Sequence, residues 1–111
     1  MMRKPMMMLF LLVFTSCNYA NVANDILLSR TSEQKAQILS GIINAAGATC
    51  VPVVAFYQGL DRYDAAYWNI ACSNGHAYVI QIANDAAATT TIIQCDAMKS
   101  LGAQCFKRFG F

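Results

Sequence analysis

Hydrophobic residues recur at helical spacing in the stretch from residue 32 to residue 46. The positions that share one face of such a helix are Ile38, Leu39, Ile42, Ile43 and Ala46. Thr31 and Gln34 form a capping-box pair just before this stretch, and Gly47 stands where a helix-terminating glycine belongs. The pattern therefore predicts an amphipathic helix over about residues 32–46.

After this helix the pattern is that of β-strands. Cys50 to Gln58 is rich in valine and aromatic residues, and its Pro52 favours the edge of a sheet because proline cannot donate to a ladder. Two further runs flank Cys72-Ser73-Asn74-Gly75-His76, which is typical of a hairpin with a three-residue loop. A fourth strand is expected from Thr89 to Cys95, followed by a short helix that Asp96 caps.

The hydrophobic pattern also selects the register of the hairpin. With Cys72 opposite His76, Trp68 lies opposite Ile80, and all the large apolar side chains fall on one face. A two-residue loop would divide them between both faces. The other face is expected to be half polar and exposed, and it carries Tyr67, Asn69, Ala71, Ala77, Val79 and Gln81.

These elements predict an α+β fold. We expect an N-terminal amphipathic helix packed on a four-stranded antiparallel β-meander, then a short C-terminal helical turn. Neither an internal repeat nor a linker divides the chain, so residues 21–111 are expected to form one small domain.

The first twenty residues have the order of an export signal. Arg3 and Lys4 precede an unbroken apolar run, Met6 to Phe14, and small or polar residues follow from Thr15. The run is shorter than the roughly 20 residues that a membrane-spanning helix needs. We therefore expect residues 1–20 to direct export to the periplasm or the medium.

Two processing routes remain open. Cleavage after Ala20 or Ala23 would release a soluble chain, although each site has an asparagine at its third-last position. Ser16-Cys17 is similar to the end of a lipoprotein signal, with Phe14 where leucine is usual. Lipidation of Cys17 would tether the domain to a membrane.

Four cysteines remain beyond the signal, namely Cys50, Cys72, Cys95 and Cys105. An even number of cysteines in an exported chain favours two disulfides over a zinc site, and three connectivities are possible. The strand order favours Cys50 with Cys72, and Cys95 with Cys105, because strand three would separate Cys72 from Cys95.

The charge of the domain excludes one class of function. The full chain carries a formal charge of +2, and the removal of Arg3 and Lys4 leaves six basic and six acidic residues. A neutral domain without a basic stripe is not expected to bind nucleic acid. The basic end, Lys107 to Phe111, is expected to be solvated.

One resemblance follows from this order of elements. The helix ending in Ala45-Ala46-Gly47, then Tyr67-Trp68-Asn69-Ile70, a turn at Asn74-Gly75 and the strand Tyr78 to Ile82 resemble the layout of PepSY-type domains. They also resemble small uncharacterised bacterial secreted proteins. The resemblance covers about residues 33–97 and implies a module that binds or inhibits exported enzymes, without implying any site residue.

The residue types do not favour catalysis. His76 is the single histidine and lies beside a cysteine that a disulfide is expected to use, and Asp61 and Asp64 fit a solvated loop. We expect a protein that is not an enzyme and that binds neither a cofactor nor a metal ion. The expected function is a binding or inhibitory module of the bacterial envelope, and the alternative is a lipid-anchored or secreted structural protein. The candidate surface for an envelope partner comprises Arg62, Tyr63, Tyr67, Asn69 and Gln81.

Overall fold

The computed structural model describes residues 21–110. The predicted export signal and Cys17 therefore lie outside the described residues. The chain forms three helices and one four-stranded sheet within these residues. In chain order they are α1 (Val22–Leu28), α2 (Ser32–Ala45), β1 (Pro52–Leu60), β2 (Ala66–Cys72), β3 (Ala77–Ile82), β4 (Thr90–Gln94) and α3 (Cys95–Lys99).

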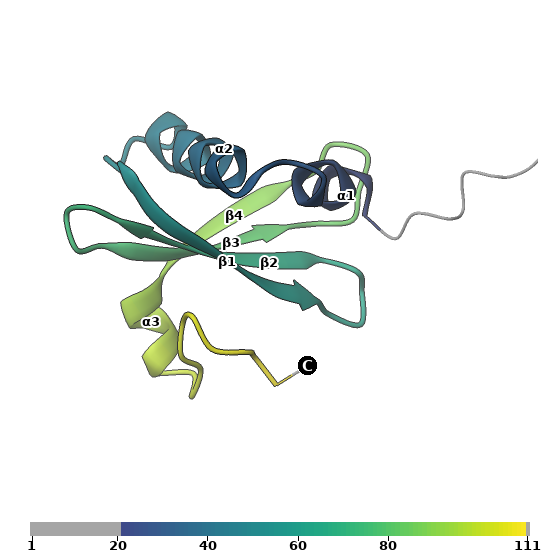
Figure 1. Ribbon diagram of the computed structural model, residues 1–111. Coiled ribbons are helices and arrows are strands. Elements are labelled where there is room, and N and C mark those ends of the chain that lie inside the picture. The colour runs from purple at the N-terminus through teal and green to yellow at the C-terminus, as the bar shows by residue number, and fades with distance from the viewer. Residues whose placement is uncertain (1–20, 111) are drawn as a thin grey trace, which may run out of the picture.

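The sheet is an antiparallel meander in the order β1-β2-β3-β4. Helices α1 and α2 cover one face, which we call the inner face, while α3 and the C-terminal segment lie on the opposite, outer face (Figure 1). The α+β prediction is confirmed. The outer face is covered too, so the expectation that it is open to solvent is wrong in part.

Helix α2 begins and ends where its sequence signals predict. Thr31 accepts a hydrogen bond from the backbone of Gln34, and the Gln34 side chain accepts one from the backbone of Thr31, which completes the capping box. Gly47 follows the helix with a φ of 98°, a left-handed conformation that glycine adopts without strain. Leu39 and Ile43 of α2 are fully buried, whereas Ile38 is 43% exposed, so it is not part of the core that the pattern predicts.

The predicted hairpin register is confirmed. Trp68 pairs with Ile80, Ile70 with Tyr78, and Ala66 with Ile82. These residues build the core between the inner face and helices α1 and α2. The cluster comprises Leu27, Leu39, Ile43, Cys50, Ala66, Trp68, Ile70, Cys72, Tyr78, Ile80 and Ile82.

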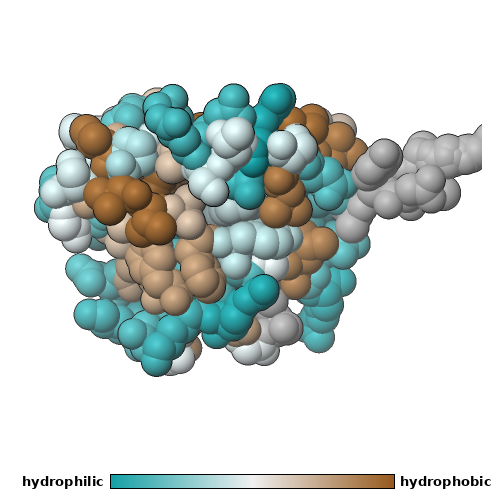
Figure 2. All heavy atoms as spheres, in the orientation of Figure 1, coloured by the Kyte–Doolittle hydropathy of each residue, from teal (hydrophilic) through white to brown (hydrophobic). Residues whose placement is uncertain are grey.

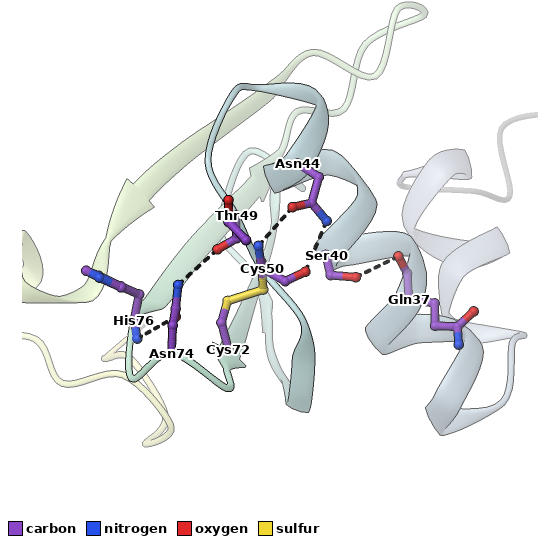
Figure 3. The surroundings of a disulfide bond; sticks show 8 residues. All are labelled: Gln37, Ser40, Asn44, Thr49, Cys50, Cys72, Asn74 and His76. Carbon is purple, nitrogen blue, oxygen red and sulfur yellow. Dashed lines mark hydrogen bonds between the residues drawn. A yellow bond between two sulfur atoms is a disulfide. The ribbon is translucent and has the colours of Figure 1, made fainter.

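Both disulfides have the predicted connectivity. Cys50 and Cys72 are joined across the start of β1 and the end of β2, with Cα atoms 5.1 Å apart. Cys95 and Cys105 are joined with Cα atoms 6.0 Å apart. Asn44 of α2 fixes the first bridge, because its side-chain amide donates to the Cys50 carbonyl and accepts from the Cys50 amide (Figure 3).

The start of α3 differs from the prediction. Asp96 lies inside the first turn rather than at the cap, and the capping position is held by Gln94, whose side chain makes no capping hydrogen bond. Asp96 instead pairs with Lys99 at 3.9 Å. A carboxylate in the first turn still interacts favourably with the helix dipole.

Candidate functional site

Cys72 and His76, the residues that could form a thiol site, do not form one. Cys72 is buried and bonded to Cys50, so its sulfur is not a free nucleophile. The His76 imidazole points away from this disulfide, and its backbone amide donates to Asn74 (Figure 3). Asn74 in turn donates to the Thr49 carbonyl, so the hairpin tip is tied to the chain that precedes β1.

The loop between β1 and β2 is organised by Asp61. One carboxylate oxygen accepts hydrogen bonds from the backbone amides of Tyr63 and Ala65, and the other accepts one from the Tyr67 hydroxyl at 2.9 Å. Gln81 of β3 donates to the same hydroxyl. The carboxylate thus holds a tight loop and links it to the outer face.

These contacts shift two pKa values. Burial acts to raise the pKa of Asp61, but hydrogen bonds from Tyr63, Tyr67 and Ala65, together with the nearby Arg62, outweigh it and hold the pKa below 3.8. Burial and the neighbouring Asp61 carboxylate raise the pKa of Tyr67 above its ordinary value. The pair stays as a carboxylate and a neutral phenol at physiological pH, which suits a structural link.

The five residues of the predicted partner surface do not form one exposed surface. Arg62 and Tyr63 lie at the loop tip, where the guanidinium stacks 5.2 Å from the Tyr63 ring centre and Tyr63 is 71% exposed. Tyr67 and Gln81 are half-buried, and Asn69 is fully buried. The expectation that Asn69 is accessible is wrong because the C-terminal segment covers it.

The C-terminal segment packs on the outer face instead of extending into solvent. Backbone amides of Phe106 and Phe109 donate to the side chains of Asn69 and Gln58, and the Phe106 ring lies 6.4 Å from that of Phe56. The prediction of a solvated end is therefore wrong for Phe106 and Phe109, whereas the side chains of Lys107 and Arg108 are exposed. Phenylalanines near a chain end give it apolar area to bury, which the charge pattern alone does not reveal.

A groove lies on the other side of the molecule, between α2 and β1. It is open to solvent and measures about 690 Å³. Its walls are the first half of α2 and the first half of β1, and Tyr57 and Trp68 form part of its lining. Lys35 of α2 crosses it, with Nζ 5.9 Å from the Trp68 ring centre. Figure 2 shows hydrophobic side chains gathered on this part of the surface.

The exposed apolar side chains beside this groove come from the edge strand and the residue before it. Val51 and Val53 are 61% and 64% exposed. Val54 is 48% exposed and pairs with Ala71, so its side chain stands on the outer face of the sheet. Strand β1 is nine residues long, contains no charged residue and has no strand on its outer side. The opposite edge, β4, has five residues and begins with two threonines. Long, uncharged edges are the ones that accept an additional strand.

Sequence reasoning predicted β1 as an edge strand but did not select its valines. A valine-rich strand fits a core position equally well, but Val53 lies in a bulge between the paired residues Pro52 and Val54. A bulge bends the strand locally and leaves the extra residue unpaired. Such a bulge leaves no signature in the residue types here.

Two further properties can be stated for residues 21–110. Histidine, cysteine and carboxylate side chains do not gather there in a group that could hold a metal ion. None of the helices in the same range is long and apolar enough to cross a membrane. The two disulfides fit an oxidising compartment.

Comparisons with protein-family models, with curated proteins and with solved structures found no match to this chain.

Proposed function

We propose that this chain is an exported, non-catalytic binding or inhibitory module of the bacterial cell envelope, and that it binds its partner along β1. The observation that carries the proposal is the combination of an uncharged edge strand, exposed valines and an open groove on one side of the molecule. Monomeric proteins rarely leave such apolar surface at a free strand edge without a use for it.

The shape of this surface indicates the chemistry of the partner. An extended segment of another protein can add to β1 as a fifth strand, with main-chain hydrogen bonds providing affinity. Alternate side chains of that segment would point into the groove toward Tyr57 and Trp68, so apolar residues fit there. The Cys50–Cys72 disulfide ties the start of β1 to the end of β2, and this rigid support reduces the ordering cost of binding.

The contacts of Asn21 disfavour cleavage after Ala23. Asn21 caps α1, and its side-chain amide donates to the carbonyls of Asp64 and Ile82. Cleavage after Ala23 would remove these contacts, whereas cleavage after Ala20 or lipidation of Cys17 would keep them. Mass spectrometry of the exported chain distinguishes a first residue Asn21 from a lipidated Cys17, and the lipid mass would favour the anchored structural protein.

A comparison of two valine variants tests the binding surface. Wild type, Val53→Lys and Val22→Lys are exported with an affinity tag and purified from an envelope extract. Val22 is 58% exposed on α1 and serves as the matched control. We expect a partner to co-purify with wild type and Val22→Lys, and at least tenfold less of it with Val53→Lys. Equal recovery with both variants would contradict the proposal that the partner binds at β1.

The resemblance to PepSY-type domains remains a prediction that a structure of the complex can examine.

A further inference from the structure

The C-terminal segment, residues 106–109, contacts the outer face in the manner of a bound peptide (Figure 1). Cys105 is fixed by its disulfide with Cys95, and beyond it the chain is held on the outer face by side chains of β1 and β2. It forms neither a strand nor a helix. The segment is therefore attached to the sheet through side chains and not through a ladder.

Two buried side-chain amides bind the backbone of this segment. Asn69 Oδ1 accepts hydrogen bonds from the Phe106 amide at 2.6 Å and from Gln58 Nε2 at 2.8 Å. Gln58 Oε1 accepts one from the Phe109 amide at 2.8 Å, and Gln58 Nε2 also donates to the Lys107 carbonyl. The atoms that these two side-chain amides bind are backbone atoms, so a different sequence could satisfy the same amides. One side chain of the segment adds a further bond, because Arg108 Nη1 donates to the Gln58 carbonyl at 2.6 Å.

Side-chain contacts add a preference for spacing. The Phe106 ring meets Phe56 edge-on with centroids 6.4 Å apart, and the Phe109 ring meets Tyr67 in the same way at 6.2 Å. Lys107 and Arg108 between them are exposed. The two side chains of the segment that make ring contacts are therefore aromatic and three residues apart.

The segment leaves one feature of the site unused. Asn69 is 0% exposed, yet its Nδ2 has no hydrogen-bond partner within the described part of the chain. A buried donor without a partner is unfavourable, because it has lost its hydration. A ligand with an acceptor at that position would satisfy the site better than the segment of this chain does.

We propose that the outer face is a peptide-binding site, occupied in cis by residues 106–109 and open to an extended segment of another protein with aromatic side chains at positions i and i+3. The incoming segment displaces only the residues beyond Cys105, since the disulfide with Cys95 holds the base of the C-terminal segment in place. This site is separate from the groove at β1, and the two proposals are independent.

The test uses the full chain and a labelled, N-acetylated peptide with the sequence of residues 106–111. In wild type the tethered segment competes at an effective concentration in the millimolar range, so the peptide should bind weakly. The variant Phe106→Ala/Phe109→Ala weakens the competitor, and we expect its affinity for the peptide to be at least tenfold higher than that of wild type, as measured by fluorescence anisotropy.

Peptide variants show whether the binding mode is the one seen here. N-methylation at the position of Phe109 removes the donor to Gln58, and we expect at least a tenfold loss of affinity. N-methylation at the position of Arg108, whose amide makes no hydrogen bond to the described residues, is the matched control and should change affinity less than threefold.

A second measurement does not depend on the folding of the variant. In wild type labelled with ¹⁵N, several millimolar peptide should move the amide signals of Phe106 and Phe109 toward those of a free chain end while signals from β3 stay in place. Unchanged signals in wild type, or equal losses from the two N-methylated peptides, would overturn the proposal.

Discussion

At the scale of single residues, Asn24 connects the first helix to the sheet. Its side-chain oxygen accepts from Trp68 Nε1 at 2.7 Å, and its side-chain nitrogen donates to the Tyr57 hydroxyl at 2.9 Å. Asn24 is 1% exposed, so these bonds form away from water. The indole of the core tryptophan therefore depends on a residue that lies 44 positions earlier in the chain.

Replacing Asn24 by alanine should destabilise the fold markedly. The change leaves the buried indole N–H without an acceptor, and we expect the free energy of unfolding to fall by about 1–3 kcal/mol. Asn84→Ala, at an exposed loop position, is the matched control and should stay within about 0.5 kcal/mol of wild type. Urea unfolding measures both variants, and similar losses would show that the Asn24 hydrogen bonds contribute little.

Asp61 should make the free energy of unfolding depend on pH in the acid range. Because its folded-state pKa lies below 3.8, the ionised carboxylate stabilises the fold above that pH, and the contribution is lost as the pH falls through the folded-state value. Asp61→Asn does not titrate at this position. The difference in unfolding free energy between wild type and Asp61→Asn should be constant above about pH 5 and shrink below about pH 3.8.

Tyr67→Phe is the control for this effect. It removes the hydroxyl that donates to Asp61. In the Tyr67→Phe background, the change in unfolding free energy caused by Asp61→Asn should therefore vary less with pH. A difference that is the same at pH 2.5 and pH 6 in the original background would mean that the hydrogen bonds do not act on the charge of Asp61.

At the scale of the elements, the covered outer face changes what a core substitution should do. Val79 points to the outer face and is fully buried, whereas Val53 on β1 is 64% exposed. Val79→Ala should therefore cost about 1.5–3 kcal/mol of unfolding free energy, and the chemically identical Val53→Ala less than about 0.5 kcal/mol. Ile80→Ala on the inner face should cost about 2–5 kcal/mol. A negligible cost at Val79 would show that the outer face is open in solution.

The elements that local patterns define could be predicted from the sequence. The capping box at Thr31, the hairpin register around Gly75 and both disulfides follow from short-range signals and strand order. The burial of Asn69 could not be predicted, because it depends on a segment 37 residues later that packs on the sheet through side-chain amides. The exposure of Val53 could not be predicted either, because a bulge is a backbone irregularity with no fixed residue type here.

At the scale of the whole molecule, the two disulfides should contribute unequally. Loop-closure entropy gives about 3.4 kcal/mol for the bridge of sequence separation 22 and about 2.7 kcal/mol for that of separation 10. Cys50 and Cys72 are also in the core, whereas Cys95 and Cys105 are half-buried. Thermal unfolding of the two double alanine variants should show the larger loss for Cys50→Ala/Cys72→Ala, and the reverse order would contradict this account of the core.

Apart from the outer face that residues 106–109 cover, the molecule as a whole presents two exposed surfaces to a partner, the groove at β1 and the loop tip at Arg62 and Tyr63. We propose β1 as the binding surface of an exported module, and site-specific photo-crosslinking in cells tests this surface. A photoreactive amino acid is placed at Val53, at Tyr63 or at the control position Val22, each of which is more than half exposed. We expect a crosslinked partner from position 53 and none from position 22. Crosslinks from position 63 alone, or from none of the three positions, would contradict it.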